Sequence, residues 1–116
     1  MGEMQEVPSL DTPTPVRILI VDDEEDICWA VSGVVRKQGW QPIMATSGEE
    51  ALASIQKTQP DLVLLDLQLP DIKGETIIKK MNATFPDIVI IVITGYGSTQ
   101  DAVRMVKSGV YDYLTK

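Results

Sequence analysis

The chain has 116 residues, 44% of them hydrophobic and 23% charged, which is enough for one domain with a real core and too few for two. Its formal net charge of −7 argues against nucleic-acid binding by this segment, because phosphate backbones are bound by Lys and Arg. The chain has no histidine, which excludes imidazole zinc sites, His-based triads and a role as phosphohistidine donor.

The N-terminal stretch MGEMQEVPSLDTPTP contains proline and few large apolar residues, which predicts a flexible arm over residues 1–15. A strand is predicted over Val16–Val21, followed by an amphipathic helix that starts at Glu24 and stops at Gly39, a residue type favoured just after a helix. The expected inward stripe of this helix is Ile27, Val31, Val34 and Val35. The lone cysteine, Cys28, excludes an internal disulfide and fits a reducing cytoplasm.

The next segment predicts an edge strand and a capped helix. Trp40–Ala45 is a weaker strand, and Pro42 places it at a sheet edge. Ser47 and Glu50 have capping-box spacing and begin a helix that Pro60 closes. The inward residues of that helix are Ala51, Leu52 and Ile55.

The rest of the chain continues the alternation of strands and helices. Strands are expected at Leu62–Leu65, Ile88–Ile93 and residues 111–115. A helix between the first two of these strands, at Glu75–Ala83, should bury Ile77, Ile78 and Met81. A further helix before the last strand should be capped by Ser98 or Thr99, end at Gly109 and point Ala102, Val103 and Val106 inward. The continuous apolar runs LVLL and IVIIVI are typical of strands buried on both faces. This order predicts an α/β fold, a parallel sheet with helices on both faces and right-handed crossovers.

Polar side chains stand where the predicted strands end. Asp22 and Asp23 follow the first strand, Asp66 the third, Thr94 the fourth and Lys116 the fifth. Ligands of open parallel sheets bind at the carboxyl ends of the strands, so these groups should converge on one rim. Taken singly, Asp22 and Asp23 could instead cap the first helix, Thr94 could be an ordinary strand residue and Lys116 a solvated surface residue, whereas Asp66 directly after LVLL fits such an account least.

Together these groups indicate a particular chemistry. Carboxylates a few ångströms apart repel one another, and their oxygen atoms suit Mg²⁺. The ammonium of Lys116 and the hydroxyl of Thr94 could then hold a dianionic group beside Asp66. Such a site fits phosphoryl transfer to an aspartate nucleophile, which forms an acyl phosphate.

The segments ILIVDDEED, GEEAL, PDLVLLDLQLPDIKG, VIIVITGYGS and GVYDYLTK resemble, in this order and spacing, a receiver domain of a two-component response regulator. The resemblance covers residues 16–116, and TGYGS with AVRMVKSGVYDYLTK is especially similar to NtrC-like transcriptional activators. It implies a flavodoxin-like, doubly wound sheet of five parallel strands in the order 2-1-3-4-5. The family continues past the position of Lys116 into a fifth helix, so we expect a C-terminally truncated receiver domain that lacks this helix and leaves part of one sheet face uncovered.

The resemblance also implies roles for single residues. Asp66 matches the phosphoacceptor, and Asp22 and Asp23 match the acidic pair that binds Mg²⁺ with it. The main-chain carbonyl of Gln68 matches the group that completes the metal shell, and Lys116 matches the lysine that pairs with the phosphoryl oxygens. Thr94 matches the switch hydroxyl, and Tyr113 matches the aromatic switch residue that turns inward.

The implied function is a cytoplasmic signalling switch. A sensor histidine kinase or a phosphotransfer protein would supply the phosphoryl group, and the surface of the fourth helix and fifth strand would respond. The family further implies a C-terminal output domain with ATPase and DNA-binding parts and the capacity to form a homodimer. The net charge argues against nucleic-acid contact by this segment, and no apolar run approaches the length of a membrane span. Such a domain catalyses only its own phosphorylation and dephosphorylation and is not an enzyme in the ordinary sense.

Three other readings stay open at this point. A haloacid-dehalogenase-type phosphatase would place a second Asp two residues after the nucleophile, where this chain has Gln68. A flavodoxin-like nucleotide or flavin binder would need a phosphate loop after the first strand, and DDEED there repels phosphate. A pseudo-receiver, an interaction domain that is never phosphorylated, is disfavoured by the complete acidic set.

Overall fold

The computed structural model describes residues 15–95, 104, 107 and 109–115 of the chain. The strands are β1 (Arg17–Val21), β2 (Gln41–Ala45), β3 (Leu62–Asp66), β4 (Val89–Thr94) and β5 (Asp112–Thr115). The labelled helices are α1 (Glu25–Lys37), α2 (Gly48–Thr58) and α3 (Gly74–Thr84). None of the helices within these ranges is long and apolar enough to cross a membrane.

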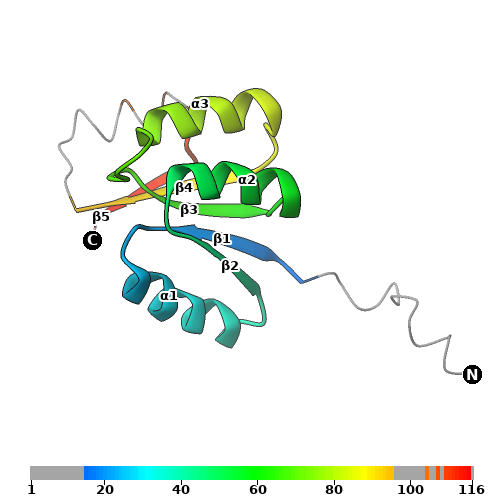
Figure 1. The fold of residues 1–116 in the computed structure, drawn as a ribbon. Helices are drawn as coiled ribbons and strands as arrows, with labels where there is room; N and C mark the ends of the chain where they lie inside the picture. Colours follow the sequence, from blue (N-terminus) through cyan, green and yellow to red (C-terminus); the bar gives the residue numbers. More distant parts are fainter. Residues whose placement is uncertain (1–14, 96–103, 105–106, 108, 116) are drawn as a thin grey trace, which may run out of the picture.

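The strands form one sheet in the order β2-β1-β3-β4-β5, and every neighbouring pair is parallel, which confirms the predicted fold class. Strand β2 lies at the edge, as expected from Pro42. Because all strands run the same way, their carboxyl ends meet at one edge of the sheet (Figure 1). This edge is where the predicted site residues stand.

Helices cover the two faces of the sheet unequally. Helix α1 lies on one face, and α2 and α3 lie on the other (Figure 1). Alternate strand residues point to opposite faces: Leu19 and Val21 join the core under α2 and α3, whereas Ile18 and Ile20 pack with residues of α1. The buried helix residues of the larger core are Ala51, Ile55, Ile77, Ile78 and Met81, as the sequence predicts for these helices.

The prediction for the inward face of α1 was partly wrong. Val34 is 61% exposed, whereas Cys28, Ser32 and Val35 are buried. The helix is therefore rotated toward the line formed by these last three positions, which are spaced i, i+4 and i+7. Ser32 can be buried there because its hydroxyl donates a 2.7 Å hydrogen bond to the Cys28 carbonyl.

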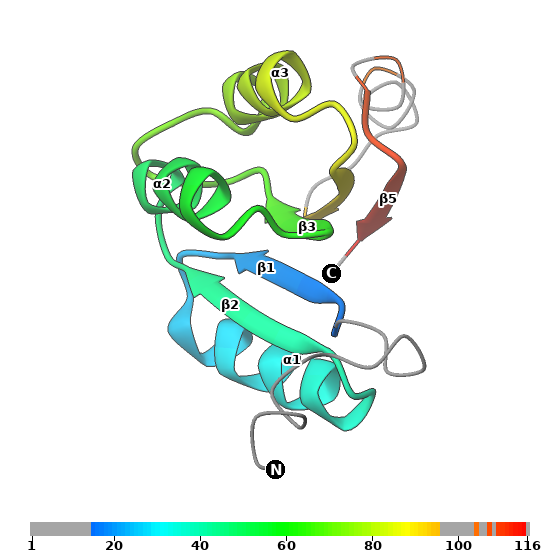
Figure 2. The same cartoon turned by 90° about the vertical axis from the view of Figure 1, so that its right-hand side faces the viewer.

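The expectation that the central strands are buried on both faces was also too simple. Leu62, Leu64, Ile91 and Ile93 are only half-buried, and Leu114 is 47% exposed. Of the described helices only α1 lies on this face, and it packs against β1 and β2 (Figure 2). The apolar side chains of β3, β4 and β5 on this face are therefore partly open to solvent.

The predicted helix ends are largely confirmed. Gly39 follows the C-cap of α1 with φ +83°, a conformation that glycine adopts without strain. The Ser47 side chain accepts a 3.1 Å hydrogen bond from the Glu50 N–H, as in a capping box. The Glu50 carboxylate differs from the box, because it accepts hydrogen bonds from the N–H and hydroxyl of Thr46.

The predicted helix between β4 and β5 lies mostly outside the described residues. Arg104 and Lys107 are helical, and Gly109 has φ +97°, which suits the expected helix end. Arg104 forms a 3.2 Å ion pair with Glu75 in the first turn of α3. This pair is largely exposed, so it contributes little to stability.

Candidate functional site

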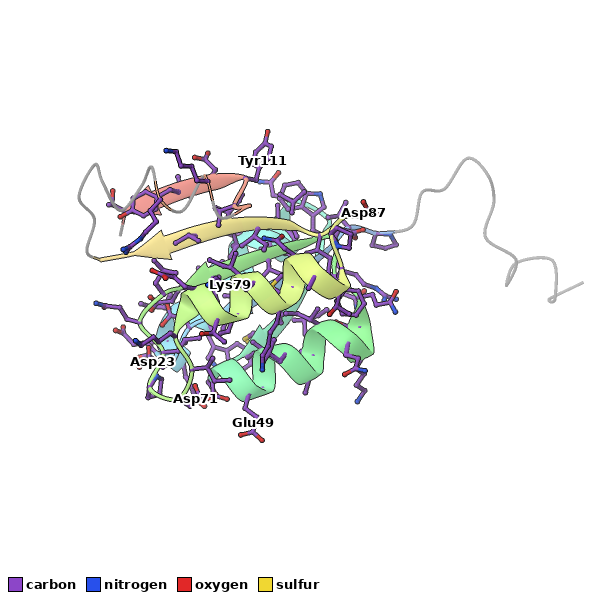
Figure 3. The ribbon with its side chains drawn as sticks, turned by 90° about the horizontal axis from the view of Figure 1, so that it is seen from above. Asp23, Glu49, Asp71, Lys79, Asp87 and Tyr111 are labelled. Carbon is purple, nitrogen blue, oxygen red and sulfur yellow. The ribbon has the colours of Figure 1, made fainter. Side chains whose placement is uncertain are left out.

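An acidic cluster lies at the carboxyl end of the sheet. Asp22, Asp23 and Asp66 each offer a carboxylate oxygen, and these oxygens lie within 4.8 Å of one another. Asp22 and Asp66 are 4% exposed, whereas Asp23 is exposed. Figure 3 shows Asp23 at the end of the molecule to which the strand arrows point, opposite Asp87.

Sheet register brings the members of the cluster together. Val21 of β1 is aligned with Leu65 of β3, so the next residue of each strand, Asp22 and Asp66, stands at the same edge. The Asp22 N–H donates a 3.1 Å hydrogen bond to the carbonyl of Ala45, the last residue of β2. The end of β1 is therefore fixed by strands on both sides.

Each buried carboxylate also fixes the backbone that follows it. Asp22 Oδ1 accepts a 2.9 Å hydrogen bond from the Glu24 N–H, and Asp66 Oδ1 accepts a 3.0 Å bond from the Gln68 N–H. Both are Asx-type turns, in which an Asp side chain bonds the backbone two residues on. The N-cap of α1 is Glu24, so the alternative in which Asp22 or Asp23 is the N-cap residue is not what the structure shows.

A buried cysteine supports the same segment. The Cys28 thiol donates a 3.3 Å hydrogen bond to the Asp22 carbonyl. Burial, reinforced by the nearby charge of Asp22, raises the pKa of the Cys28 thiol. The thiol therefore stays protonated and remains a donor that holds the start of the loop between β1 and α1.

The donor set of the cluster fits a hard divalent cation. Two nearly buried carboxylates beside a third are costly to desolvate unless a positive charge compensates them. Their oxygen atoms are the ligands that Mg²⁺ and Ca²⁺ take in proteins. Asp23 also lines an open hollow with Glu24, Glu25, Asp26, Thr46 and Pro70. The hollow gives a cation an acidic approach to the cluster.

The structure describes only part of the other predicted site residues. Gln68 is exposed and follows β3 directly. Thr94 ends β4, and its backbone is aligned with Thr115 of β5; the Thr94 side chain and Lys116 lie outside what the structure describes. Tyr113 is half-buried and packs against the core under α2 and α3.

Sequence reasoning missed Asp71, which lies in the loop between β3 and α3. Its carboxylate accepts a 2.8 Å hydrogen bond from the Gly48 N–H and a 2.9 Å bond from the Glu49 N–H at the start of α2. These two N–H groups lower the pKa of Asp71, and the one of Glu49 has the larger effect. Nothing local in the sequence indicates this contact, because the partners are more than twenty residues apart.

The comparisons with known proteins identify one family. Residues 18–116 match the model of the response regulator receiver domain family. The chain is 35% identical over 101 residues to the transcriptional regulatory protein ZraR of Salmonella typhimurium, a match that covers 87% of this chain and 23% of ZraR. The chain spans less than half the length of the first curated relatives it matches, at 44% and 45% of two transcriptional regulators of Mycobacterium tuberculosis.

Two solved structures are similar in fold and sequence. The beryllofluoride-activated NtrC4 receiver domain dimer has a TM-score of 0.81 and 38% identity, covering 86% of this chain and 83% of that one. A response regulator from Burkholderia pseudomallei, solved with a phosphorylated aspartic acid, a calcium ion and citrate, has a TM-score of 0.81 and 30% identity. That match covers 87% of this chain and 59% of the Burkholderia chain.

Proposed function

This chain belongs to the response regulator receiver domain family, and we propose that it works as a switch in which Asp66 accepts a phosphoryl group. The observation that carries the proposal is the acidic cluster itself. Asp22, Asp23 and Asp66 place oxygen atoms within 4.8 Å of one another at the carboxyl end of the sheet. In a parallel sheet this edge is where ligands bind.

The proposed reaction moves a phosphoryl group from a phosphohistidine to Asp66. A carboxylate oxygen of Asp66 attacks phosphorus, the bond between phosphorus and the imidazole nitrogen breaks, and its electron pair stays on that nitrogen. The product is an acyl phosphate on Asp66 and a free histidine on the donor. The donor histidine lies outside this chain, which contains none, and a sensor histidine kinase or a phosphotransfer protein would supply it.

Mg²⁺ is the proposed cofactor. The carboxylates of Asp22, Asp23 and Asp66 and the main-chain carbonyl of Gln68 would hold it, together with water. When bound, Mg²⁺ neutralises negative charge on the phosphoryl oxygens. The Asx-type turn between Asp66 and the Gln68 N–H supports this arrangement, because it holds the Gln68 peptide next to the acceptor.

The response to phosphorylation is proposed to spread through β4 and β5. A phosphoryl group adds about −1.5 to −2 charge at Asp66, and Lys116 and Mg²⁺ would balance it. The hydroxyl of Thr94 would donate to a phosphoryl oxygen, and Tyr113 would turn further inward beside it. The neighbouring positions of Val92 and Tyr113 in the β4–β5 pair support this coupling.

The wider role follows the proposed chemistry. Residues 1–15 would be an arm and residues 16–116 a cytoplasmic receiver domain, joined in the whole protein to an output domain that binds DNA and hydrolyses ATP. The surface formed by β5 and the segment before it would change on phosphorylation and control that output, through a homodimer. The regulators that the chain matches are transcriptional regulators, which supports transcription as the output.

The test is intact mass spectrometry after incubation with acetyl phosphate, with and without Mg²⁺. The wild-type chain should gain one phosphoryl group only when Mg²⁺ is present, and Asp66→Asn should gain none. Asp61→Asn is the matched control, because Asp61 stands just before β3 at the other end of the strand, and it should be labelled like the wild type. Undiminished labelling of Asp66→Asn would refute the acceptor, and an unlabelled wild type would favour the pseudo-receiver.

A further inference from the structure

Loop 67–73, which joins β3 to α3, carries Gln68 at one end and Asp71 near the other. The first end is fixed by the hydrogen bond from the Gln68 N–H to Asp66 Oδ1. The side chain of Leu67 then packs against the start of α3, where a Cβ on Gly74 would lie 3.0 Å from the Leu67 Cα. These two contacts leave open how the stretch from Gln68 to Asp71 is fixed.

Asp71 fastens this stretch to α2. Both of its carboxylate oxygens accept backbone N–H groups, from Gly48 at 2.8 Å and Glu49 at 2.9 Å. Figure 3 shows Asp71 and Glu49 on the same side of the molecule, with Asp23 near the same end. An anionic group at a helix N-terminus is favoured by the partial positive charge there, so the bond is suited to hold the loop firmly.

The packing around this bond leaves the loop no room to move closer. Gly48 is buried, and a Cβ there would lie 2.8 Å from the Ile72 Cβ and 3.2 Å from Asp71 Oδ1. The start of α2 therefore packs directly against the side chains of Asp71 and Ile72 in the loop. Helix α2 acts as the support, and the glycine allows the close approach.

The segment between Gln68 and Asp71 is short, so the hydrogen bonds of Asp71 to α2 also restrict the position of Gln68 beside the acidic cluster. Only Leu69 and Pro70 separate Gln68 from Asp71. Leu69 is half-buried against the core, and the ring of Pro70 restricts its own backbone. Pro70 also lines the hollow beside Asp23. A shift of Asp71 would therefore move both Gln68 and the wall of the hollow.

We propose that Asp71 is a positioning residue: it ties loop 67–73 to the N-terminus of α2 and so fixes Gln68 and Pro70 at the rim of the acidic cluster. This inference rests on the proposed function insofar as the cluster binds Mg²⁺. It differs from simple helix capping, which Ser47 also performs: the Ser47 hydroxyl accepts from the Glu50 N–H, a bond that stays within α2.

The test compares Asp71→Ala with Ser47→Ala, which removes a cap of the same helix and leaves the loop contact in place. Mg²⁺ affinity is measured by isothermal titration calorimetry on variants shown to be folded by circular dichroism, and amide exchange is measured at Gln68. Asp71→Ala should weaken Mg²⁺ binding on the order of tenfold, as loss of a group that orients metal ligands does, and should speed exchange at Gln68. Ser47→Ala should lower the melting temperature and leave both readouts unchanged.

Asp71→Asn serves if Asp71→Ala does not fold. Its amide oxygen still accepts one N–H, so the losses should lie between those of the wild type and full removal. Wild-type Mg²⁺ affinity and Gln68 exchange in the Asp71 variants would overturn the inference, as would equal losses in Ser47→Ala. A wild type that binds no Mg²⁺ would contradict the proposed function instead, and exchange at Gln68 would still decide whether Asp71 holds the loop.

Discussion

Two glycines in helices should respond to the same substitution with opposite signs. Gly74 is the first residue of α3, and a Cβ there would lie 2.5 Å from the Leu67 Cδ2 and 3.0 Å from the Leu67 Cα. The side-chain atom can rotate away, but the Cα can move only with the backbone of the loop. Gly33 lies inside α1, and a Cβ there would meet nothing within 4 Å.

The expected sizes follow from these distances. Overpacking a tight contact costs about 1–3 kcal/mol, and Gly74→Ala gains little helix propensity in return because it lies in the first turn, so we expect a net loss of about 1–2 kcal/mol. Gly33→Ala should gain about 0.5–1 kcal/mol, the usual difference between Gly and Ala in a helix interior. Urea unfolding followed by circular dichroism measures both. A Gly74→Ala variant at least as stable as the wild type would refute the reasoning.

Three further predictions concern the site. Asp23→Asn should weaken Mg²⁺ binding, measured by calorimetry, on the order of tenfold. The same substitution should change the free energy of unfolding by less than about 0.5 kcal/mol because Asp23 is exposed. Equal Mg²⁺ affinity in the variant and the wild type would contradict the role of Asp23. Thr94→Ala should be phosphorylated like the wild type but show a smaller change in amide exchange from Gly95 to Lys107 on adding beryllofluoride; an undiminished change would count against Thr94 as the switch. The pKa of Asp71 is lowered below its ordinary value of 3.8, so its stabilising contribution is complete above that pH and is lost as the pH falls through the folded-state pKa. The stability difference between wild type and Asp71→Asn in thermal unfolding should therefore shrink only below pH 3.8, and a difference that already shrinks near pH 6 would argue against this assignment.

The parallel sheet and the acidic cluster could be predicted because both depend on short-range patterns. Apolar runs such as LVLL identify the strands, and a polar residue directly after each run must stand at the carboxyl edge of a parallel sheet. This pattern alone predicts that Asp22 and Asp66 stand at the same edge of the sheet. The register of β1 against β3 then confirmed that the two residues meet.

Two residues, Ser32 and Asp71, were missed because a polar group satisfied its hydrogen bonds in a way that the pattern does not show. The apolar spacing of α1 placed Val34 on the inward face, but Val34 is exposed, and a hydrogen bond to the Cys28 carbonyl lets Ser32 be buried. Asp71 reads as a loop residue, but it caps a helix that starts 23 positions earlier in the chain. Such long-range contacts between a side chain and the backbone leave no periodic signal.

The central claim is that Asp66 accepts a phosphoryl group within a Mg²⁺ site built on Asp22 and Asp23. The most direct measurement is a crystal structure of the chain with Mg²⁺ and beryllofluoride, which mimics an acyl phosphate. We expect the beryllofluoride on a carboxylate oxygen of Asp66 and Mg²⁺ at about 2.1 Å from carboxylate oxygens of the cluster and from the Gln68 carbonyl. Beryllofluoride on another carboxylate, or Mg²⁺ bound away from these residues, would contradict it.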